Sequence, residues 1–232
     1  MTLNSEKEIE QTWGSHKPLL RAVMEILRPE SVVECGCGKY STPIIEQTAK
    51  KIITIEHDTI WASKIIKQYT DHLNHHWLIQ ALPNAHNGIR RSAMKDVDLA
   101  WVDNYYAKLN LEPCDFLFVD SFACARVPAM LHLTDGAQMV LLHDLERNSP
   151  EFYSYHLIGN KMKGWWRYRY APLGMISKEH VIPWTDLFAR QELSSEELLK
   201  MQVVIDAEAD RLWGFSAKLV DITSIAEGWG NN

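Results

Sequence analysis

The stretch from Val32 to Pro43 constrains the fold of this chain more than any other. It reads Val-Val-Glu-Cys-Gly-Cys-Gly-Lys-Tyr-Ser-Thr-Pro, so an apolar run enters a Gly-x-Gly turn and a helical pattern follows over residues 44–50. Thr42 suits the capping position of that helix and Pro43 suits its first turn. The glycines let a ligand approach the backbone, and the helix N-terminus offers free N–H groups to an anionic group. The stretch therefore predicts a nucleotide-binding corner.

Strand and helix patterns alternate along the rest of the chain, which predicts an α/β fold with a mostly parallel sheet. We expect strands at 31–35, 51–55, 77–82, 115–120, 139–144, 165–170 and 183–189. We expect helices at 43–50, 59–73, 96–109 and 194–212, the last opened by a capping box. Two helices are expected to bury apolar faces that contain Ile60, Trp61, Ile65, Ile66 and Tyr69, and Val97, Ala100, Trp101, Tyr105 and Leu109.

Two of the expected strands deliver ionisable side chains to one edge of the sheet. Asp120 follows the apolar run 116–119, and His143 and Asp144 follow the apolar run 139–142. Ligands of open α/β sheets bind at the carboxyl ends of the strands. Arg126 stands on the turn after Asp120, where it can pair with that carboxylate or with a substrate anion. We expect these four side chains to line one cleft.

Together these motifs resemble those of the class I S-adenosylmethionine-dependent methyltransferases of the small-molecule type. The turn has the Glu-x-Gly-x-Gly form of their first motif, with Ser41 where a dinucleotide-binding fold has its third glycine. The resemblance implies a three-layer, Rossmann-like fold with a mostly parallel seven-stranded sheet. It implies cofactor contacts at Glu34, Gly36, Cys37, Gly38, Ser41, Glu56 and His57, with Leu82 and Asn84 beside the adenine.

The resemblance also implies S-adenosylmethionine as cofactor and methyl transfer to an oxygen or nitrogen of a small-molecule substrate. The implied catalytic residues are Asp120, Arg126, His143 and Asp144. Histidine titrates in the range of a general base, so His143 is the expected base, with Asp120 or Asp144 to orient it. Catechol-type methyltransferases hold magnesium with an acid after the fourth strand and an Asp-Asn pair after the fifth. Here Leu145 replaces that asparagine, so the sequence does not decide whether magnesium is used.

Two other functions stay open from the sequence. Glu56 can accept both ribose hydroxyls of a nicotinamide cofactor, so an NAD(P)-dependent oxidoreductase fits this position equally well. Glu34 before the turn and Ser41 after it fit such an enzyme less well. A protein that binds S-adenosylmethionine without catalysis is the second alternative.

The expected methyltransferase-like domain spans residues 1–190 and begins with a cap helix. In that cap, Ser15 and His16 could contact the ligand or substrate, but the favoured expectation is that Ser15 caps the helix and His16 lies on the surface. A helical extension over residues 191–232 is expected to pack on the same domain. This extension either covers an edge of the sheet or joins two copies of the chain, so a homo-oligomer stays open.

Composition narrows the class of partner. The net charge of −6 argues against a protein held mainly on nucleic-acid phosphates, although the aromatic and arginine run at 165–170 could stack on bases. The sequence has no apolar stretch of about 18 residues, so no membrane span is expected. Four cysteines without regular spacing, and an N-terminus unlike a signal peptide, fit a cytoplasmic protein with reduced thiols.

Two clusters of metal-ligating residue types are expected to be structural. The segment 71–76, Asp-His-Leu-Asn-His-His, is expected to form a solvated helix C-terminus, where histidine is favoured and adjacent histidines point apart. Cys35 and Cys37 lack partner cysteines at zinc-finger spacing, so we expect them to fill the strand end and the turn.

Overall fold

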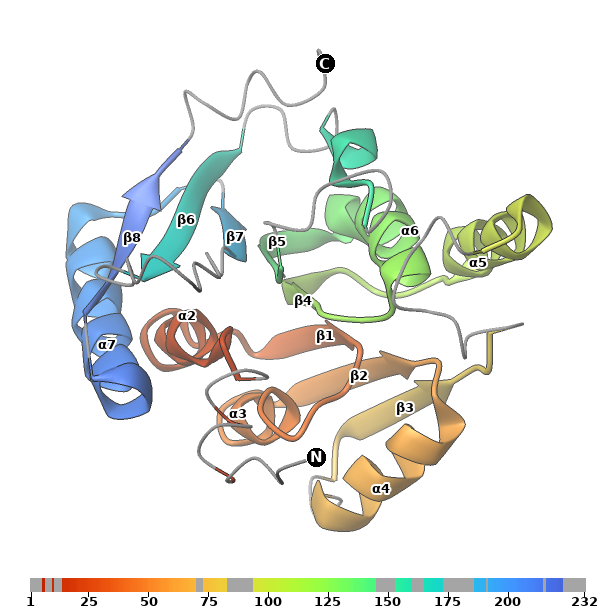
Figure 1. Cartoon of the computed structure of the whole chain (residues 1–232), viewed down its shortest axis with the longest axis horizontal. Helices are drawn as coiled ribbons and strands as arrows, with labels where there is room; N and C mark the ends of the chain where they lie inside the picture. Colours follow the sequence, from red (N-terminus) through yellow and green to blue (C-terminus); the bar gives the residue numbers. More distant parts are fainter. Residues whose placement is uncertain are drawn as a thin grey trace, which may run out of the picture.

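The strands of the computed structural model join into one sheet of eight (Figure 1). The structure describes residues 14–69, 73–82, 94–144, 153–159, 165–172, 186–190, 192–214 and 216–222, together with Glu6 and Glu10. The strands are β1 (Ser31–Cys35), β2 (Lys51–Glu56), β3 (His75–Ile79), β4 (Cys114–Val119), β5 (Ala137–Leu142), β6 (Trp166–Pro172), β7 (Asp186–Arg190) and β8 (Ala217–Asp221). The helices are α2 (Lys17–Ala22), the π-helical turn η1 (Val23–Leu27), α3 (Thr42–Glu46), α4 (Thr59–Tyr69), α5 (Asp96–Lys108), α6 (Ala123–Leu133) and α7 (Ser195–Trp213), with short 3-10 turns η4 (Thr134–Gly136) and η6 (Tyr155–Ile158).

The strand order is β3-β2-β1-β4-β5-β7-β6-β8. The first five strands of this order pair in parallel, whereas β7 is antiparallel to both β5 and β6. The predicted α/β, three-layer, mostly parallel fold is confirmed. The predicted strand number of seven is too low by one, because β8 follows α7 and extends the sheet beyond β6.

Helices cover both faces of the sheet, and adjacent residues of one strand serve opposite faces. Val33 and Leu117 pack in a cluster that contains Tyr106 of α5 and Val127 of α6. Their neighbours along the same strands pack in a second cluster, which contains side chains of α2, α3 and α7. Figure 1 shows the same arrangement, with α5 and α6 on one side of the strands and α2, α3 and α7 on the other. The chain therefore forms three layers with the central strands buried on both sides.

Several element boundaries differ from the predicted ones. Helix α3 ends at Glu46 and α4 at Tyr69, earlier than expected, and strand β3 begins at His75 instead of Trp77. His75 and His76 are therefore strand residues, so the predicted helix C-terminus is wrong at these two positions, whereas Asp71 and His72 lie outside the described residues. The strand places the His75 ring against Glu46 and Thr54, with nitrogen–oxygen distances of 2.7 Å to each. The backbone of His75 pairs with Ile52 of β2, so the pairing of β3 with β2 already includes this histidine.

The predicted apolar faces of α4 and α5 are also wrong in part. The buried residues of α4 are Ala62 and Ile65, and those of α5 are Asp98, Val102 and Tyr106. Ile60 and Val97, which begin the expected stripes, are 69% and 70% exposed. Both helices lie at the edge of the fold, where a narrow stripe is enough to cover the sheet. None of the helices in the described part of the chain is long and apolar enough to cross a membrane.

Candidate functional site

The glycine turn after β1 packs directly on the end of β4. Gly36 has φ +91°, and a Cβ on it would lie 2.4 Å from the carbonyl oxygen of Asp120 and 2.7 Å from Cα of Ser121. The backbone N–H of Asp120 donates to the carbonyl of Cys35 at 2.8 Å. A side chain at position 36 would therefore separate the two strand ends. The close packing places the glycine turn beside the ionisable residues that follow β4.

Glu34 is fully buried beneath the glycine turn. Its carboxylate accepts hydrogen bonds from the hydroxyls of Ser41 at 2.7 Å, Thr42 at 3.0 Å and Thr54 at 2.9 Å. Burial raises its pKa to about 8. Ser41, and not Thr42 as expected, is the N-cap residue of α3. These contacts show that Glu34 ties β1, β2 and the start of α3 together.

Glu56 lies at the end of β2 and faces the glycine turn. Its carboxylate accepts from the backbone N–H and the thiol of Cys37, at 2.9 and 3.3 Å, and from the N–H groups of His57 and Asp58, at 2.6 and 2.8 Å. Burial raises its pKa. The backbone carbonyl of Cys37 in turn accepts a hydrogen bond from the indole N–H of Trp61 at 2.8 Å. Glu56 and the glycine turn are thus hydrogen-bonded to each other before any ligand binds.

His57 lies under this corner. One ring nitrogen is 2.9 Å from the carbonyl of Gln80 and the other is 2.9 Å from the hydroxyl of Tyr106. Burial lowers the pKa of His57 to about 4. The ring therefore connects the ends of β2 and β3 with α5. Of the two expected adenine contacts, Leu82 is buried and Asn84 lies outside the described residues.

The guanidinium of Arg126 brings together the ends of β4 and β5. It donates to Oδ1 of Asp120 at 2.6 Å and to Oδ2 of Asp144 at 3.3 Å. It also donates to the carbonyls of Ser121 and His143, at 2.7 Å each. Asp144 itself adopts φ +60°, a left-handed conformation that aspartate tolerates better than most residues. The structure thus brings together the four residues that the sequence placed at this edge.

His143 is buried among carboxylates. Its Nδ1 lies 2.6 Å from Oδ1 of Asp186, and its Nε2 lies 3.1 Å from Oδ1 of Asp144. Burial opposes the charged ring, but the carboxylates of Asp144, Asp186 and Asp120 outweigh it and raise the pKa of His143 to about 10. The surrounding carboxylates therefore favour the protonated ring over the neutral one. The expected contact with Asp144 is present, and Asp186 is a second carboxylate partner that the sequence did not indicate.

The cap before α2 closes over the same cluster. Ser15 and His16 are each 2% exposed, so the prediction that His16 lies on the surface is wrong. The Ser15 hydroxyl is 3.4 Å from Nε2 of His143, and it does not cap the helix, whose N-cap residue is His16. The His16 ring packs edge-on against that of His143, with 4.9 Å between centroids. Burial lowers the pKa of His16 to about 4.

The expected magnesium ligands do not fit this ion. Arg126 lies between Asp120 and Asp144 and pairs with both carboxylates, so a cation already holds the space between them. Leu145, which replaces the expected asparagine, lies outside the described residues. The structure therefore gives no support to a catechol-type magnesium site.

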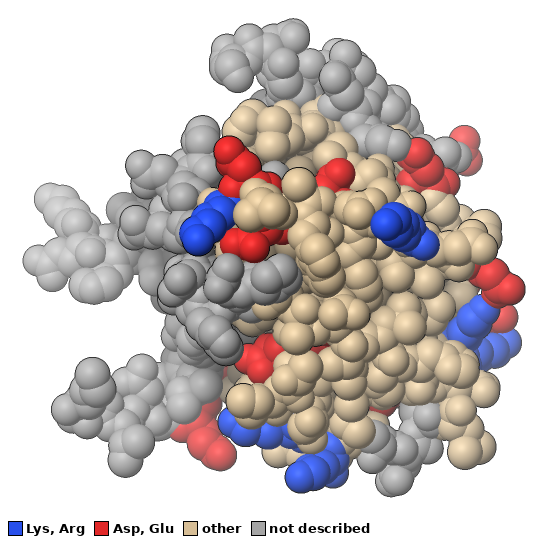
Figure 2. Space-filling view, turned by 90° about the vertical axis from the view of Figure 1, so that its right-hand side faces the viewer, with Lys and Arg blue, Asp and Glu red and all other residues tan. Residues whose placement is uncertain are grey.

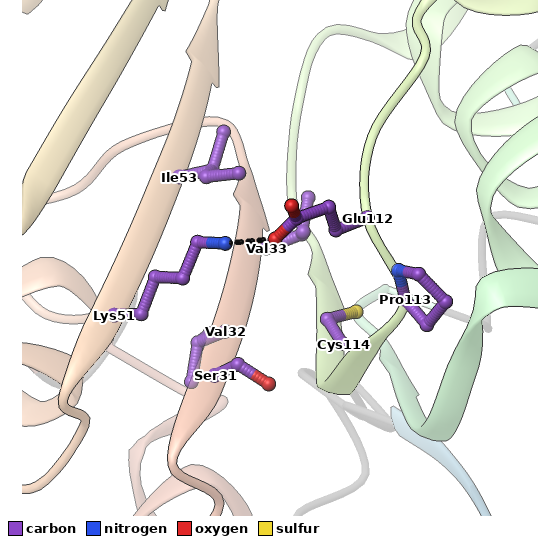
Figure 3. A pocket seen from close by; sticks show the side chains of 8 residues that line it. All are labelled: Ser31, Val32, Val33, Lys51, Ile53, Glu112, Pro113 and Cys114. Carbon is purple, nitrogen blue, oxygen red and sulfur yellow. Dashed lines mark hydrogen bonds and ion pairs between the residues drawn. The ribbon is translucent and has the colours of Figure 1, made fainter.

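Asp186 is the site residue that the sequence analysis missed. It opens β7, which runs antiparallel to β5, so the beginning of β7 lies beside the end of β5. An acid at the start of an antiparallel strand next to β5 was the signal that could have identified it. The hollow in Figure 3 lies at the other edge of the sheet, around the first residues of β1, β2 and β4, where Lys51 and Glu112 form an ion pair. Ligands of open α/β sheets bind at the carboxyl edge, so we place the site there.

The strand order, with an antiparallel β7 between β5 and β6, is that of the class I methyltransferase fold. Solved structures agree with this assignment. The N-methyltransferase NodS from Bradyrhizobium japonicum matches with a TM-score of 0.51 at 11% identity, over 78% of this chain and 97% of that chain. The O-methyltransferase from Bacillus cereus in complex with SAH matches with a TM-score of 0.50 at 13% identity, over 82% of this chain and 92% of that chain. At these identities the likeness shows the fold alone.

Sequence comparisons add no closer relative. No model of a protein family matches the chain, and a search of curated proteins finds no match.

Proposed function

We propose that this protein is an S-adenosylmethionine-dependent methyltransferase that acts on an oxygen or nitrogen of a small molecule. The observation that carries the proposal is the contact of Gly36 with the backbone of Asp120 and Ser121. It joins a glycine turn suited to a nucleoside with a cluster of charged side chains suited to the reacting group. S-adenosylmethionine would supply a methyl group on a positively charged sulfur.

The corner around Glu56 fits the nucleoside part of this cofactor. A carboxylate has about four acceptor positions, and the thiol of Cys37, a weak donor, takes one of them on Glu56 at 3.3 Å. A ribose hydroxyl is a better donor and could replace that thiol. We assign Glu56 to the ribose and Gly36, Cys37 and Gly38 to the backbone that the ligand approaches. Ser41 and His57 would act as supports, because the protein already occupies their polar atoms.

Glu34 favours this cofactor over a dinucleotide. In dinucleotide-binding folds the pyrophosphate lies at the N-terminus of the first helix. Here the carboxyl group of Glu34 accepts hydrogen bonds from the hydroxyls of Ser41 and Thr42 at the start of α3. These two hydroxyls are therefore not available to a phosphate. The methionine part of S-adenosylmethionine carries no phosphate, so it does not need them.

The charged cluster can favour methyl transfer electrostatically. Its three carboxylates, Asp120, Asp144 and Asp186, outnumber its two cations, Arg126 and His143. The attacking oxygen or nitrogen gains positive charge as its bond to the methyl carbon forms and the carbon–sulfur bond breaks. A fixed excess of negative charge lowers the energy of that state. Arg126 and His143 hold the carboxylates in place.

The surface favours a small substrate over a nucleic acid. On the face turned to the viewer in Figure 2, the described lysine and arginine side chains form separate groups, with acidic side chains near some of them and tan surface between others. Binding along a phosphate backbone uses a continuous basic stripe. The net charge of −6 also argues against binding along a phosphate backbone.

Ligand binding tests the proposal directly. The chain is heated with S-adenosylmethionine, S-adenosylhomocysteine, NAD or NADP, since a ligand that binds the native state raises the melting temperature. The two adenosyl ligands should raise it and the two nicotinamide ligands should not. Stabilisation by NAD or NADP alone would indicate an oxidoreductase and overturn the proposal.

Turnover separates an enzyme from a binding protein. Formation of S-adenosylhomocysteine is measured with panels of small alcohols, phenols and amines, and with total RNA. Product with a small molecule supports the proposal, and product with RNA alone would replace the substrate class. Binding without turnover on any panel would favour the non-catalytic alternative.

A further inference from the structure

His16 is a buried histidine that lies beside Asp120 and His143. Neither ring nitrogen has a hydrogen-bond partner among the residues that the structure describes, although the residue is 2% exposed. Buried polar atoms nearly always have a partner, so such a ring calls for an explanation. The ring of His16 lies tilted against Phe118, with 5.3 Å between centroids, and nearly perpendicular to the ring of His143, with 4.9 Å between centroids.

Three ligand atoms converge at this point. One atom each from His16, Asp120 and His143 lie within 4.8 Å of one another, and Nδ1 of His16 is 3.7 Å from Oδ2 of Asp120. Ligand atoms bound to one metal at about 2.0–2.2 Å are at most about 4.4 Å apart. Small changes in side-chain torsion would therefore bring the three atoms around one ion.

The surrounding contacts leave ligand atoms of Asp120 and His16 available and orient the ring of His143. Arg126 donates a hydrogen bond to Oδ1 of Asp120, and the other carboxylate oxygen, Oδ2, faces Nδ1 of His16. Asp186 holds Nδ1 of His143 at 2.6 Å. A carboxylate on the far nitrogen is the usual support of a metal-bound histidine, because it orients the ring and directs the other nitrogen at the ion. Nε2 lies 3.1 Å from Asp144, so a metal on this nitrogen would replace its proton, which is released to solvent.

We propose that His16, Asp120 and His143 form a binding site for a divalent transition metal, with zinc as the best match. Two imidazoles and one carboxylate suit zinc, whereas magnesium prefers oxygen ligands alone. Three protein ligands leave one coordination position for an exogenous oxygen or nitrogen. The site differs from a catechol-type magnesium site, because it uses the N-terminal cap and excludes Asp144 as a required ligand. It does not depend on methyl transfer, since metal binding can be measured alone.

Zinc binding to the full chain tests the site. The metal-free protein is titrated with ZnCl2 by calorimetry, and bound zinc is counted after dialysis. We expect one zinc per chain, and a loss of affinity of at least 10-fold in both His16→Ala and His16→Gln. His76→Ala is the matched control, because that histidine is exposed on β3, and it should bind zinc like the native chain. Melting curves of the variants without metal show whether each keeps its fold.

Cobalt identifies the ligands by spectroscopy. Cobalt(II) bound by imidazole and carboxylate should show visible d–d bands that His16→Gln abolishes. Sulfur-to-cobalt charge transfer would place the metal on a cysteine and overturn the site, as would zinc binding that is equal in the native chain and in both His16 variants. A chain that binds zinc but no adenosyl ligand would overturn the proposed function and support this site. A chain that binds the adenosyl ligands but no zinc would support the proposed function and overturn this site.

Discussion

Asp186 lies 2.6 Å from Nδ1 of His143, although 43 residues separate the two in the sequence. Asp186 is 1% exposed and His143 is 5% exposed, so both groups are removed from water. A buried charge needs a partner, because an unpaired one is costly. The pair therefore fixes the first residue of β7 to the end of β5 and orients the ring at the site.

Asp186→Asn should remove the carboxylate from this pair. We expect a loss of about 1–3 kcal/mol in the free energy of unfolding, because the buried imidazolium keeps a weaker partner. Urea denaturation measures it. In proton NMR, the downfield signal of the Nδ1–H proton should disappear. Asp210→Asn, an exposed acid on α7, is the control and should change neither quantity. A variant that keeps the downfield signal would show that this pair is not formed in solution.

Gly36→Ala should destabilise the chain by more than its backbone conformation alone explains. Both Gly36 and Gly214 have positive φ, +91° and +73°, but an added Cβ at Gly214 meets nothing within 4 Å. Gly214→Ala should therefore cost about 1–2 kcal/mol, the strain of a left-handed conformation. Gly36→Ala adds the collision with Asp120 and should cost more and weaken S-adenosylhomocysteine binding. Equal losses of stability in the two variants would contradict the packing at this turn.

Glu56→Gln should weaken binding of S-adenosylhomocysteine. Each hydrogen bond from a ribose hydroxyl to the charged carboxylate is worth about 1.5–3 kcal/mol, which corresponds to roughly 10- to 150-fold in affinity. Calorimetry measures the change. Glu112→Gln is the control, because Glu112 lies at the opposite edge of the sheet beside Lys51. Affinity equal to that of the native chain would show that Glu56 does not bind the ribose.

Glu34 should make stability depend on pH in a defined window. Burial raises its pKa from 4.5 to about 8, so the folded chain retains a proton that the unfolded chain has released between these values. Stability should therefore fall as the pH rises from 4.5 to 8, by at most about 1.4 kcal/mol per pH unit from this group.

The variant Glu34→Gln isolates this effect, because glutamine does not titrate. Unfolding free energies are measured by urea denaturation from pH 4.5 to 8 for the native chain and the variant. The difference between them should shrink or reverse toward high pH, where the native chain carries a buried charge. Parallel curves would show that Glu34 keeps an ordinary pKa.

Local patterns were enough to predict the central strands and the start of the last helix. The strand predicted at 31–35 is β1, and the predicted starts or ends of β2, β4 and β5 lie within two residues of the observed ones. The capping box of Ser194 and Glu197 is also confirmed. Each of these features depends on residues only a few positions apart.

The amino-acid sequence by itself determined the α/β class, the glycine turn and the edge at which Asp120, His143 and Asp144 lie, because strand direction and side-chain alternation are local properties. Only the tertiary structure decided that β8 joins the sheet, that the cap buries His16, and that Asp186 pairs with His143. It also decided the charge on His143. A pKa depends on burial and on charges that converge from distant segments, and the spacing of residues along a chain contains neither.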